Sequence, residues 1–232
     1  MKFRKLSITG PKGENQDVVL EPFQVGDTTW CGIADGVGSA ALGGMAARAG
    51  LDEVRGMTDA EPMGELFARV SRKLATLAEQ HGNPKSLSTT LSLLCIEGDK
   101  ANVGHVGDTR ITHYRGGGVM TRTKDQTEVQ KLLDDGVLTK NQARRYPRRN
   151  VLLSAMSAGR EYDLHEATFS LEVGDRVLLT SDGFHGKLLR PQLASLSAVT
   201  PDFDEFWRAL EEKLSVESME DDASCLAIEI DP

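Results

Sequence analysis

Two Asp-Gly pairs stand at the ends of hydrophobic runs that are typical of buried strands. Asp35-Gly36 follows the run 31–34, and Asp182-Gly183 follows the run 177–181. A carboxylate at a strand end suits a hard divalent cation, which prefers oxygen ligands, and a glycine lets the backbone come close to the ion. Asp-Gly is also a common turn dipeptide, and for either pair alone the turn is the better interpretation.

Three further acidic segments strengthen the case for a metal site. They are Asn15-Gln16-Asp17 near the N-terminus, Asp108 between two hydrophobic runs, and Asp221-Asp222 just before the last hydrophobic run. Each segment alone is a weak signal. Carboxylates at five strand ends or turns are nevertheless expected if the strands of a sandwich deliver them to one edge.

The elements that would position these residues form a layered α+β pattern. Gly98-Asp99 and Gly116-Gly117-Gly118 separate neighbouring strand-like runs by tight turns, which favours antiparallel hairpins over βαβ units. Apolar residues at helical spacing predict three helices, which would cover antiparallel sheets. The predicted strands are 18–20, 28–34, 89–96, 101–106, 110–114, 176–180 and 224–230, and the predicted helices are 43–54, 63–80 and 202–214.

Length and composition favour one domain over residues 1–232, because no linker or repeat divides the chain. The net charge of −8 argues against a nucleic-acid surface, and no apolar stretch predicts a membrane span or signal core. We therefore expect a cytoplasmic protein. Cys31, Cys95 and Cys225 lie far apart in apolar runs, so they are expected to be reduced core residues.

The order of the motifs resembles the metal-dependent protein serine/threonine phosphatases, the PPM or PP2C family, in their compact bacterial form. The resemblance spans nearly the whole chain. The matching segments are 12–17, 34–38, Ser88-Thr89-Thr90, 104–110, 147–150, 180–183 and 221–224.

The resemblance implies a four-layer αββα sandwich of two antiparallel sheets flanked by helices, with two Mn²⁺ or Mg²⁺ ions at one end. Asp35 would bridge the two ions, and Asp182 and Asp221 would complete the first site. The Gly36 carbonyl would help to bind the second ion, with Gln16 or Asp17 acting through water. Asp108 would bind a third, weaker ion shared with Asp182. Ligands that are all oxygen select Mg²⁺ or Mn²⁺ over zinc.

The activity implied by the resemblance is hydrolysis of phosphoserine and phosphothreonine on proteins by a bridging water that the metal ions activate. The partners would be a phosphorylated protein substrate and a serine/threonine kinase whose action this chain opposes. The chain would act as a monomer. Two alternatives stay open. One is a catalytically weak phosphoprotein-binding scaffold of the same fold, and the other is a phosphatase acting on a small phosphoester.

Several positions depart from the family pattern. Lys12 stands where the family usually has an arginine that grips the substrate phosphate, and a lysine offers a point charge in place of a bidentate fork. Val37 replaces the histidine that is the candidate general acid in some members. His185 and His105 are possible substitutes, although a structural role is the simpler interpretation of each.

Two other regions leave their interpretation open. Asp222 replaces the usual asparagine and could either add charge to the metal site or serve a turn. The segment 125–150 resembles the flap beside the family's active site, and it carries Arg144, Arg145, Arg148 and Arg149. This segment could govern substrate choice or could be a packed helical insertion with exposed charges.

Overall fold

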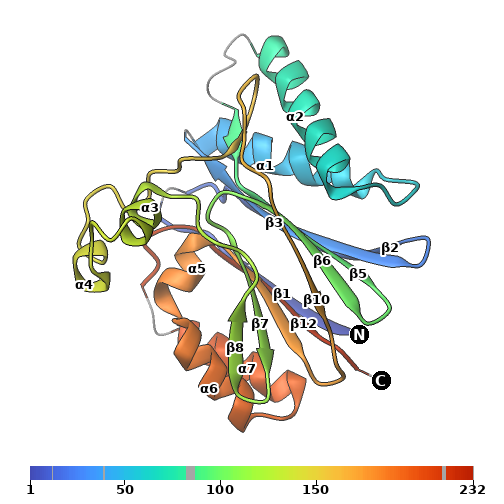
Figure 1. Ribbon diagram of the computed structural model, residues 1–232, viewed down its shortest axis with the longest axis vertical. Coiled ribbons are helices and arrows are strands. Elements are labelled where there is room, and N and C mark those ends of the chain that lie inside the picture. Colours follow the sequence, from blue (N-terminus) through green and yellow to red (C-terminus); the bar gives the residue numbers. More distant parts are fainter. Residues whose placement is uncertain (12, 39, 82–86, 216–217, 232) are drawn as a thin grey trace.

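Two antiparallel β-sheets pack face to face, and helices cover the outer face of each sheet (Figure 1). The structure is a computed structural model that describes residues 1–232 except 12, 39, 82–86, 216–217 and 232. This α+β arrangement of four layers is the fold that the sequence predicted. Among the described helices, none is both long enough and apolar enough to cross a lipid bilayer.

The first sheet brings the two ends of the chain together, because the first strand pairs with the last. Its order is β1-β12-β11-β7-β8, and Lys2 lies opposite Glu229 in the register of β1 and β12. The strands are β1 (Lys2–Ile8), β12 (Ala223–Glu229), β11 (Arg176–Thr180), β7 (Arg110–Arg115) and β8 (Gly118–Thr121).

The second sheet has the order β10-β6-β5-β3-β4-β9, and β2 pairs with β3 outside this path. Its strands are β2 (Asp17–Val25), β3 (Thr28–Val37), β4 (Ser88–Thr89), β5 (Leu91–Glu97), β6 (Lys100–Val106), β9 (Met156–Ser157) and β10 (His165–Ser170). The hairpins β5–β6 and β7–β8 confirm the predicted tight turns. Gly98 and Gly116 adopt φ values of 57° and 53° there, a region that favours glycine.

Alternating side chains of the strands divide the core into layers. In β12, Leu226 and Ile228 pack between the sheets, whereas Cys225 and Ala227 face the helices. The same alternation in β3 directs Ile33 toward the opposite sheet. All three cysteines are buried and free, as predicted. The period of two along each strand thus builds an inner core and an outer core.

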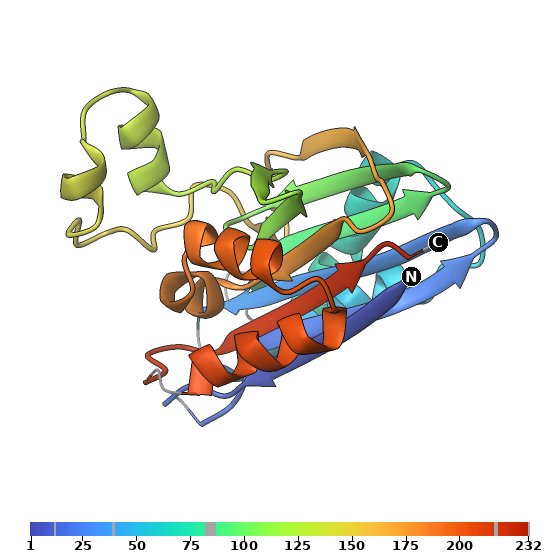
Figure 2. The same ribbon diagram turned by 90° about the horizontal axis from the view of Figure 1, so that it is seen from below.

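Helices α1 (Ala40–Arg55) and α2 (Met63–Gln80) cover the second sheet, and α5 (Asp182–Lys187), α6 (Arg190–Val199) and α7 (Phe203–Ser215) cover the first. Helix α7 begins after Asp202, whose Oδ1 accepts a hydrogen bond from the backbone N–H of Glu205 at 2.9 Å. Helices α3 (Glu128–Asp134) and α4 (Lys140–Ala143) project away from the sheets in both views (Figure 2).

The prediction of one strand over 89–96 was wrong in one respect. The structure divides this run into β4 and β5, with Thr90 between them. Thr90 uses its backbone N–H to donate to the carbonyl of Asp35 at 2.8 Å, and its Oγ1 accepts from the N–H of Asp35 at 2.9 Å. The break between β4 and β5 therefore lets Thr90 bind the backbone of Asp35 near the end of β3. The strands β1, β8, β9 and β10 were not predicted from the sequence.

Candidate metal centre

Asp35 lies near the end of β3 in a backbone that hydrogen bonds hold on both sides. Besides the two bonds with Thr90, Thr89 Oγ1 donates to the Asp35 carbonyl at 2.9 Å. These contacts satisfy the backbone groups of Asp35 and fix its position. The Asp35 side chain is therefore not needed to stabilise a turn. This argues against the interpretation of Asp35-Gly36 as a simple turn.

Asp17 lies directly opposite Asp35, because the two residues are partners in the register of β2 and β3. Ser181 Oγ donates to Asp17 Oδ2 at 2.6 Å, but the buried Oδ1 has no hydrogen-bond partner among the described residues. Burial chiefly, and to a lesser extent the charges of Asp182 and Asp222, raise the pKa of Asp17 to about 7. Two carboxylates thus face each other across neighbouring strands.

Asp182 and Asp221 belong to segments whose backbones touch. A Cβ added to Gly183 would lie 2.1 Å from the carbonyl oxygen of Asp222, so only glycine permits this approach. Ser181 and Ser224 join the same two segments, because the N–H of Ser181 donates to the Ser224 carbonyl at 3.0 Å. The second Asp-Gly pair therefore marks a close contact between α5 and the segment before β12.

Asp222 has a structural role, and its charge also acts on Asp17. Its Oδ1 accepts from the N–H of Gly10 at 2.7 Å, and its Oδ2 accepts from the N–H of Gln16 at 2.8 Å. Both oxygens hold the segment that leads into β2. Because the side chain is buried and both of its oxygens have backbone donors, Asp222 positions Gln16 and Asp17.

Gly36 and Gly43 allow α1 to approach the end of β3. A Cβ on Gly36 would lie 2.2 Å from the carbonyl carbon of Gly43, and a Cβ on Gly43 would lie 2.6 Å from Gln16 Nε2. The N–H of Gly36 donates to the Gln16 carbonyl at 3.2 Å. The structure therefore brings together Gly36 and Gln16, two of the residues that the resemblance assigned to the second ion.

Five acidic residues are here called the carboxylate edge, because the charges of the other four act on Asp35: Asp17, Asp35, Asp108, Asp182 and Asp221. Burial raises the pKa of Asp35 well above its ordinary value, and the charges of the other four raise it further. Burial and the charge of Asp182 are the first causes that raise the pKa of Asp108 to about 8.

This crowding of negative charge fits a cation. Like charges gathered in a poorly solvated place are costly, and a divalent ion would relieve both their repulsion and the unsatisfied Asp17 Oδ1. The donors are oxygen atoms, which suits Mg²⁺ or Mn²⁺. Over the described residues, no group of three or more His, Cys, Asp or Glu side chains is arranged so that it could hold a metal ion as it stands.

The two candidate histidines both have structural hydrogen bonds. His185 Nε2 donates to the Asp108 carbonyl at 3.1 Å, and burial chiefly lowers the pKa of His185 to about 3. His105 lies between Ser92 Oγ, 2.8 Å from Nδ1, and the Lys124 carbonyl, 3.1 Å from Nε2. Burial lowers the pKa of His105 to about 4. Both imidazole rings are therefore neutral at pH 7, and neither is the protonated imidazolium that a general acid requires. This supports a structural role for both histidines.

The segment 125–150, here called the flap, contains the short helices α3 and α4. None of the described side chains of α3 is fully buried, so Val129, Leu132 and Leu133 form only a half-buried stripe. Glu128 links its parts, because Tyr146 Oη donates to Glu128 Oε1 at 2.5 Å and Arg148 pairs with Glu128 Oε2 at 2.7 Å. Lys12, the predicted phosphate-binding residue, lies outside the described residues.

The sequence analysis did not predict one ion pair near the site. Arg110 Nε and Nη2 donate to the two carboxylate oxygens of Asp125 at 2.8 and 2.6 Å. This fork joins the start of β7 to the first residue of the flap. Arg110 was part of a recognised motif, but no spacing in the chain connects it with Asp125.

The comparisons with known proteins identify the family and the fold. Residues 12–222 match the family model described as "Protein phosphatase 2C". The chain is 31% identical over 158 residues to the serine/threonine protein phosphatase PstP of Mycobacterium tuberculosis, a match that covers 65% of this chain but only 30% of PstP. It is 28% identical over 194 residues to the protein phosphatase PhpP of Streptococcus pneumoniae, covering 79% of this chain and 78% of PhpP.

A solved structure shows the same fold. It is the catalytic domain of a serine/threonine protein phosphatase PstP in complex with two manganese ions, with a TM-score of 0.82 and 24% identity. The superposition covers 99% of this chain and 98% of that chain.

Proposed function

This chain belongs to the protein phosphatase 2C family, and from that premise we propose that it hydrolyses phosphoserine and phosphothreonine esters on proteins in a metal-dependent reaction. The observation that carries the proposal is the carboxylate edge. Strand ends that are far apart in the sequence deliver five acidic side chains to one place, where burial and mutual repulsion raise the pKa of Asp35. The curated relatives PstP and PhpP, which are named as protein phosphatases, support the same substrate class.

We propose that the carboxylate edge binds two Mn²⁺ or Mg²⁺ ions, with Asp35 bridging them and Asp182 and Asp221 completing the first site. The Gly36 carbonyl would serve the second ion, with Gln16 or Asp17 acting through water. When bound, such a pair of ions activates a water molecule for in-line attack on phosphorus and neutralises charge on the phosphoryl oxygens. The similarity to a structure with two manganese ions supports a pair. A third, weaker ion at Asp108 and Asp182 is a further prediction.

The chain's own contribution is to hold these oxygens in place before substrate arrives. Thr90 fixes the backbone of Asp35, and Ser181 fixes the Asp17 carboxylate by donating to Oδ2. Asp222 holds Gln16 through its backbone N–H. Each of these contacts removes a motion that would otherwise have to be frozen during the reaction, which is the physical basis of preorganisation.

We propose that the flap contributes to the choice of substrate. Among the described residues, Arg144, Arg145 and Arg149 form no ion pair with a carboxylate, whereas Arg148 is paired with Glu128. The hydrogen bond of Lys187, and to a lesser extent the charge of Arg149, lower the pKa of Glu220, the neighbour of Asp221. The charge of Arg149 therefore affects the segment that contains Asp221, a predicted metal ligand.

Lys12 is proposed to bind the substrate phosphate as a point charge. Because arginine would offer a bidentate fork, Lys12→Arg is expected to lower KM for a phosphopeptide. An unchanged or higher KM would remove Lys12 from the proposed phosphate site. We further predict that residues 1–232 act as one domain and as a monomer, in the cytoplasm, and that a serine/threonine kinase supplies the substrate. The shared core between the two sheets supports the single domain.

The decisive experiment measures Mn²⁺-dependent hydrolysis of a phosphothreonine peptide by the wild type and by Asp35→Asn, with a chelator as control. Activity that requires metal and is lost in the variant would support the proposal. Binding of Mn²⁺ by the wild type without hydrolysis of any phosphoester would favour the scaffold alternative. Hydrolysis of a small phosphoester without hydrolysis of phosphopeptides or phosphoproteins would favour the small-molecule alternative.

A further inference from the structure

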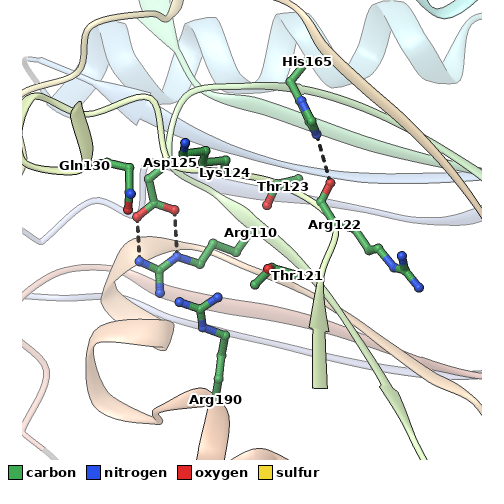
Figure 3. A pocket seen from close by; sticks show the side chains of 9 residues that line it. All are labelled: Arg110, Thr121, Arg122, Thr123, Lys124, Asp125, Gln130, His165 and Arg190. Carbon is green, nitrogen blue, oxygen red and sulfur yellow. Dashed lines mark hydrogen bonds and ion pairs between the residues drawn. The ribbon is translucent and has the colours of Figure 1, made fainter. Parts of the chain in front are cut away.

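A cleft of about 370 Å³ lies between β8, the start of the flap and α6 (Figure 3). Its lining includes the cations Arg110, Arg122, Lys124 and Arg190, and Asp125 is its one carboxylate. None of the five residues of the carboxylate edge lines this cleft. The cleft is therefore a different place from the proposed metal centre, with the opposite charge.

The charges of the cleft are not balanced. Asp125 accepts two hydrogen bonds from Arg110, and Lys124 Nζ pairs with Asp134 at 2.7 Å. Arg190 is exposed and forms no ion pair with any described residue. After these pairs are formed, Arg122 and Arg190 are the two lining cations without a carboxylate partner among the described residues. The guanidinium group of Arg122 lies over the Phe169 ring, 4.0 Å from its centroid, so Arg190 is the cation that is left to bind an anion in the cleft.

Figure 3 shows the direction of the Arg190 side chain. The guanidinium group of Arg190 points toward that of Arg110, on the side away from Asp125. Arg110 uses Nε and Nη2 for Asp125, and its Nη1 has no partner among the described residues. Two guanidinium groups that face each other repel, and an anion between them would turn this repulsion into attraction on both sides.

The remaining lining adds neutral hydrogen-bond donors. Thr123 Oγ1 accepts from the N–H of Ile111 at 3.0 Å, so its own hydroxyl proton is left to donate. Thr121 also lines the cleft, at the end of β8. Forked guanidinium groups together with hydroxyl donors match the several oxygen atoms of a phosphate group, which accept hydrogen bonds in more than one direction.

We propose that this cleft binds a phosphate group between Arg110 and Arg190, as a second anion site beside the metal centre. The group has two sources with the same chemistry: inorganic phosphate, or a second phosphate on a multiply phosphorylated protein. Only the second source rests on the proposed phosphatase activity. Since Arg110 is two residues from Asp108 in the sequence, an occupied site would lie close to the metal centre without sharing its carboxylates.

The first experiment tests binding alone. Metal-free protein in chelator is titrated with inorganic phosphate by calorimetry at constant ionic strength, with chloride as the comparison anion. Arg190→Gln is expected to weaken phosphate binding at least about tenfold, because it removes a charged donor group. Arg190→Lys keeps the charge without the fork and is expected to lose about threefold. The matched control is Arg208→Gln, which removes an exposed arginine from α7 and should bind like the wild type.

Two outcomes would overturn the proposal. One is a wild type that binds phosphate no better than chloride, and the other is an Arg190→Gln variant that binds phosphate as tightly as the wild type. Circular dichroism of each variant shows whether it is folded, and the Arg190 side-chain N–H signal in NMR reports contact with the anion directly. These measurements do not depend on turnover, so they stand even if the proposed activity fails.

The second experiment identifies the source. Peptides with one and with two phosphates are compared as substrates of the Mn²⁺-loaded wild type and Arg190→Gln. A rise in KM of about fivefold or more for the doubly phosphorylated peptide alone would assign the site to the substrate. Equal KM values for both proteins, with weaker inhibition of the variant by inorganic phosphate, would assign it to free phosphate. Equal KM values with equal inhibition would contradict a functional second site.

Discussion

The carboxylate edge and the flap differ in how the protein holds them. At the carboxylate edge, Asp35 and Asp17 lie at strand ends, and backbone and side-chain hydrogen bonds from Thr90 and Ser181 fix them against the core. In the flap, the described side chains of α3 are at most half-buried, and its parts meet through Glu128.

This difference separates two tasks. A pair of divalent ions needs oxygen atoms at fixed positions, and these are most precise on strands with a packed core beneath them. A protein substrate varies in sequence, and a loosely packed segment can adapt to it. We therefore expect substitutions at the carboxylate edge to change turnover or folding, and substitutions in the flap to change mainly KM.

The largest effect is expected for Asp182→Asn. Loss of one carboxylate from the proposed first metal site should lower kcat by about 10³-fold, which corresponds to ~4 kcal/mol of transition-state stabilisation. The matched control is Asp135→Asn, the same chemical change in the flap, where Asp135 pairs with Lys131 at 2.7 Å. Steady-state kinetics with Mn²⁺ compares the two. A kcat for Asp182→Asn within tenfold of the wild type would contradict the assignment.

The next effect concerns folding at the carboxylate edge. Gly183→Ala places a Cβ 2.1 Å from the carbonyl oxygen of Asp222, which must force two backbone segments apart. We expect a loss of about 3 kcal/mol or more in the free energy of unfolding. Urea denaturation measures it.

Gly186→Ala provides the control within the same helix. A Cβ at Gly186 meets nothing within 4 Å, so this variant should be neutral or more stable by up to about 1 kcal/mol. Equal losses for the two glycines would show that helix α5 does not depend on the close contact with Asp222.

A smaller, pH-dependent effect is expected at His105, which joins β6 to the start of the flap through the Lys124 carbonyl. The folded protein holds the pKa of His105 at about 4, below its ordinary value of 6.5, because the ring is buried. Between these values the unfolded chain binds a proton that the folded chain does not, so stability falls as the pH falls. The loss from this residue is at most ~3 kcal/mol between pH 6.5 and pH 4.

The measurement compares urea denaturation of the wild type and of His105→Gln, both without metal, at pH 7 and at pH 4.5. The variant should be less stable at pH 7 and should lose less stability on acidification. His81→Gln, which replaces an exposed histidine after α2, is the control. The same loss on acidification in the wild type and His105→Gln would rule out this role.

The smallest effect is expected inside the flap. Tyr146→Phe removes the hydrogen bond to Glu128 and loosens the link between α3 and the segment after α4. We expect KM for a phosphopeptide to change by about threefold while kcat stays the same, because the metal centre is untouched. Initial rates over a range of peptide concentrations measure both constants. A fall in kcat with KM unchanged would mean that the flap takes part in the chemical step.

Much of the fold was predictable because it depends on local signals. Apolar runs such as 224–230 and glycine turns such as Gly98-Asp99 predicted strands and hairpins, and the helical stripe over 63–80 matches α2. The strand β1 was not predicted, because three of its seven residues are basic and it gains its place only by pairing with β12. Thr90 likewise looked like a strand residue until the structure showed its bonds to Asp35.

The sequence by itself determined which oxygen-bearing residues this protein offers to a cation and, through the order of its motifs, the family to which it belongs. The tertiary structure decided what each group can do. Both carboxylate oxygens of Asp222 accept hydrogen bonds from backbone N–H groups, and the side chain of Arg190 points toward Arg110. These outcomes depend on contacts between residues far apart in the chain, and burial, charge and hydrogen-bond partners are defined only once those contacts exist.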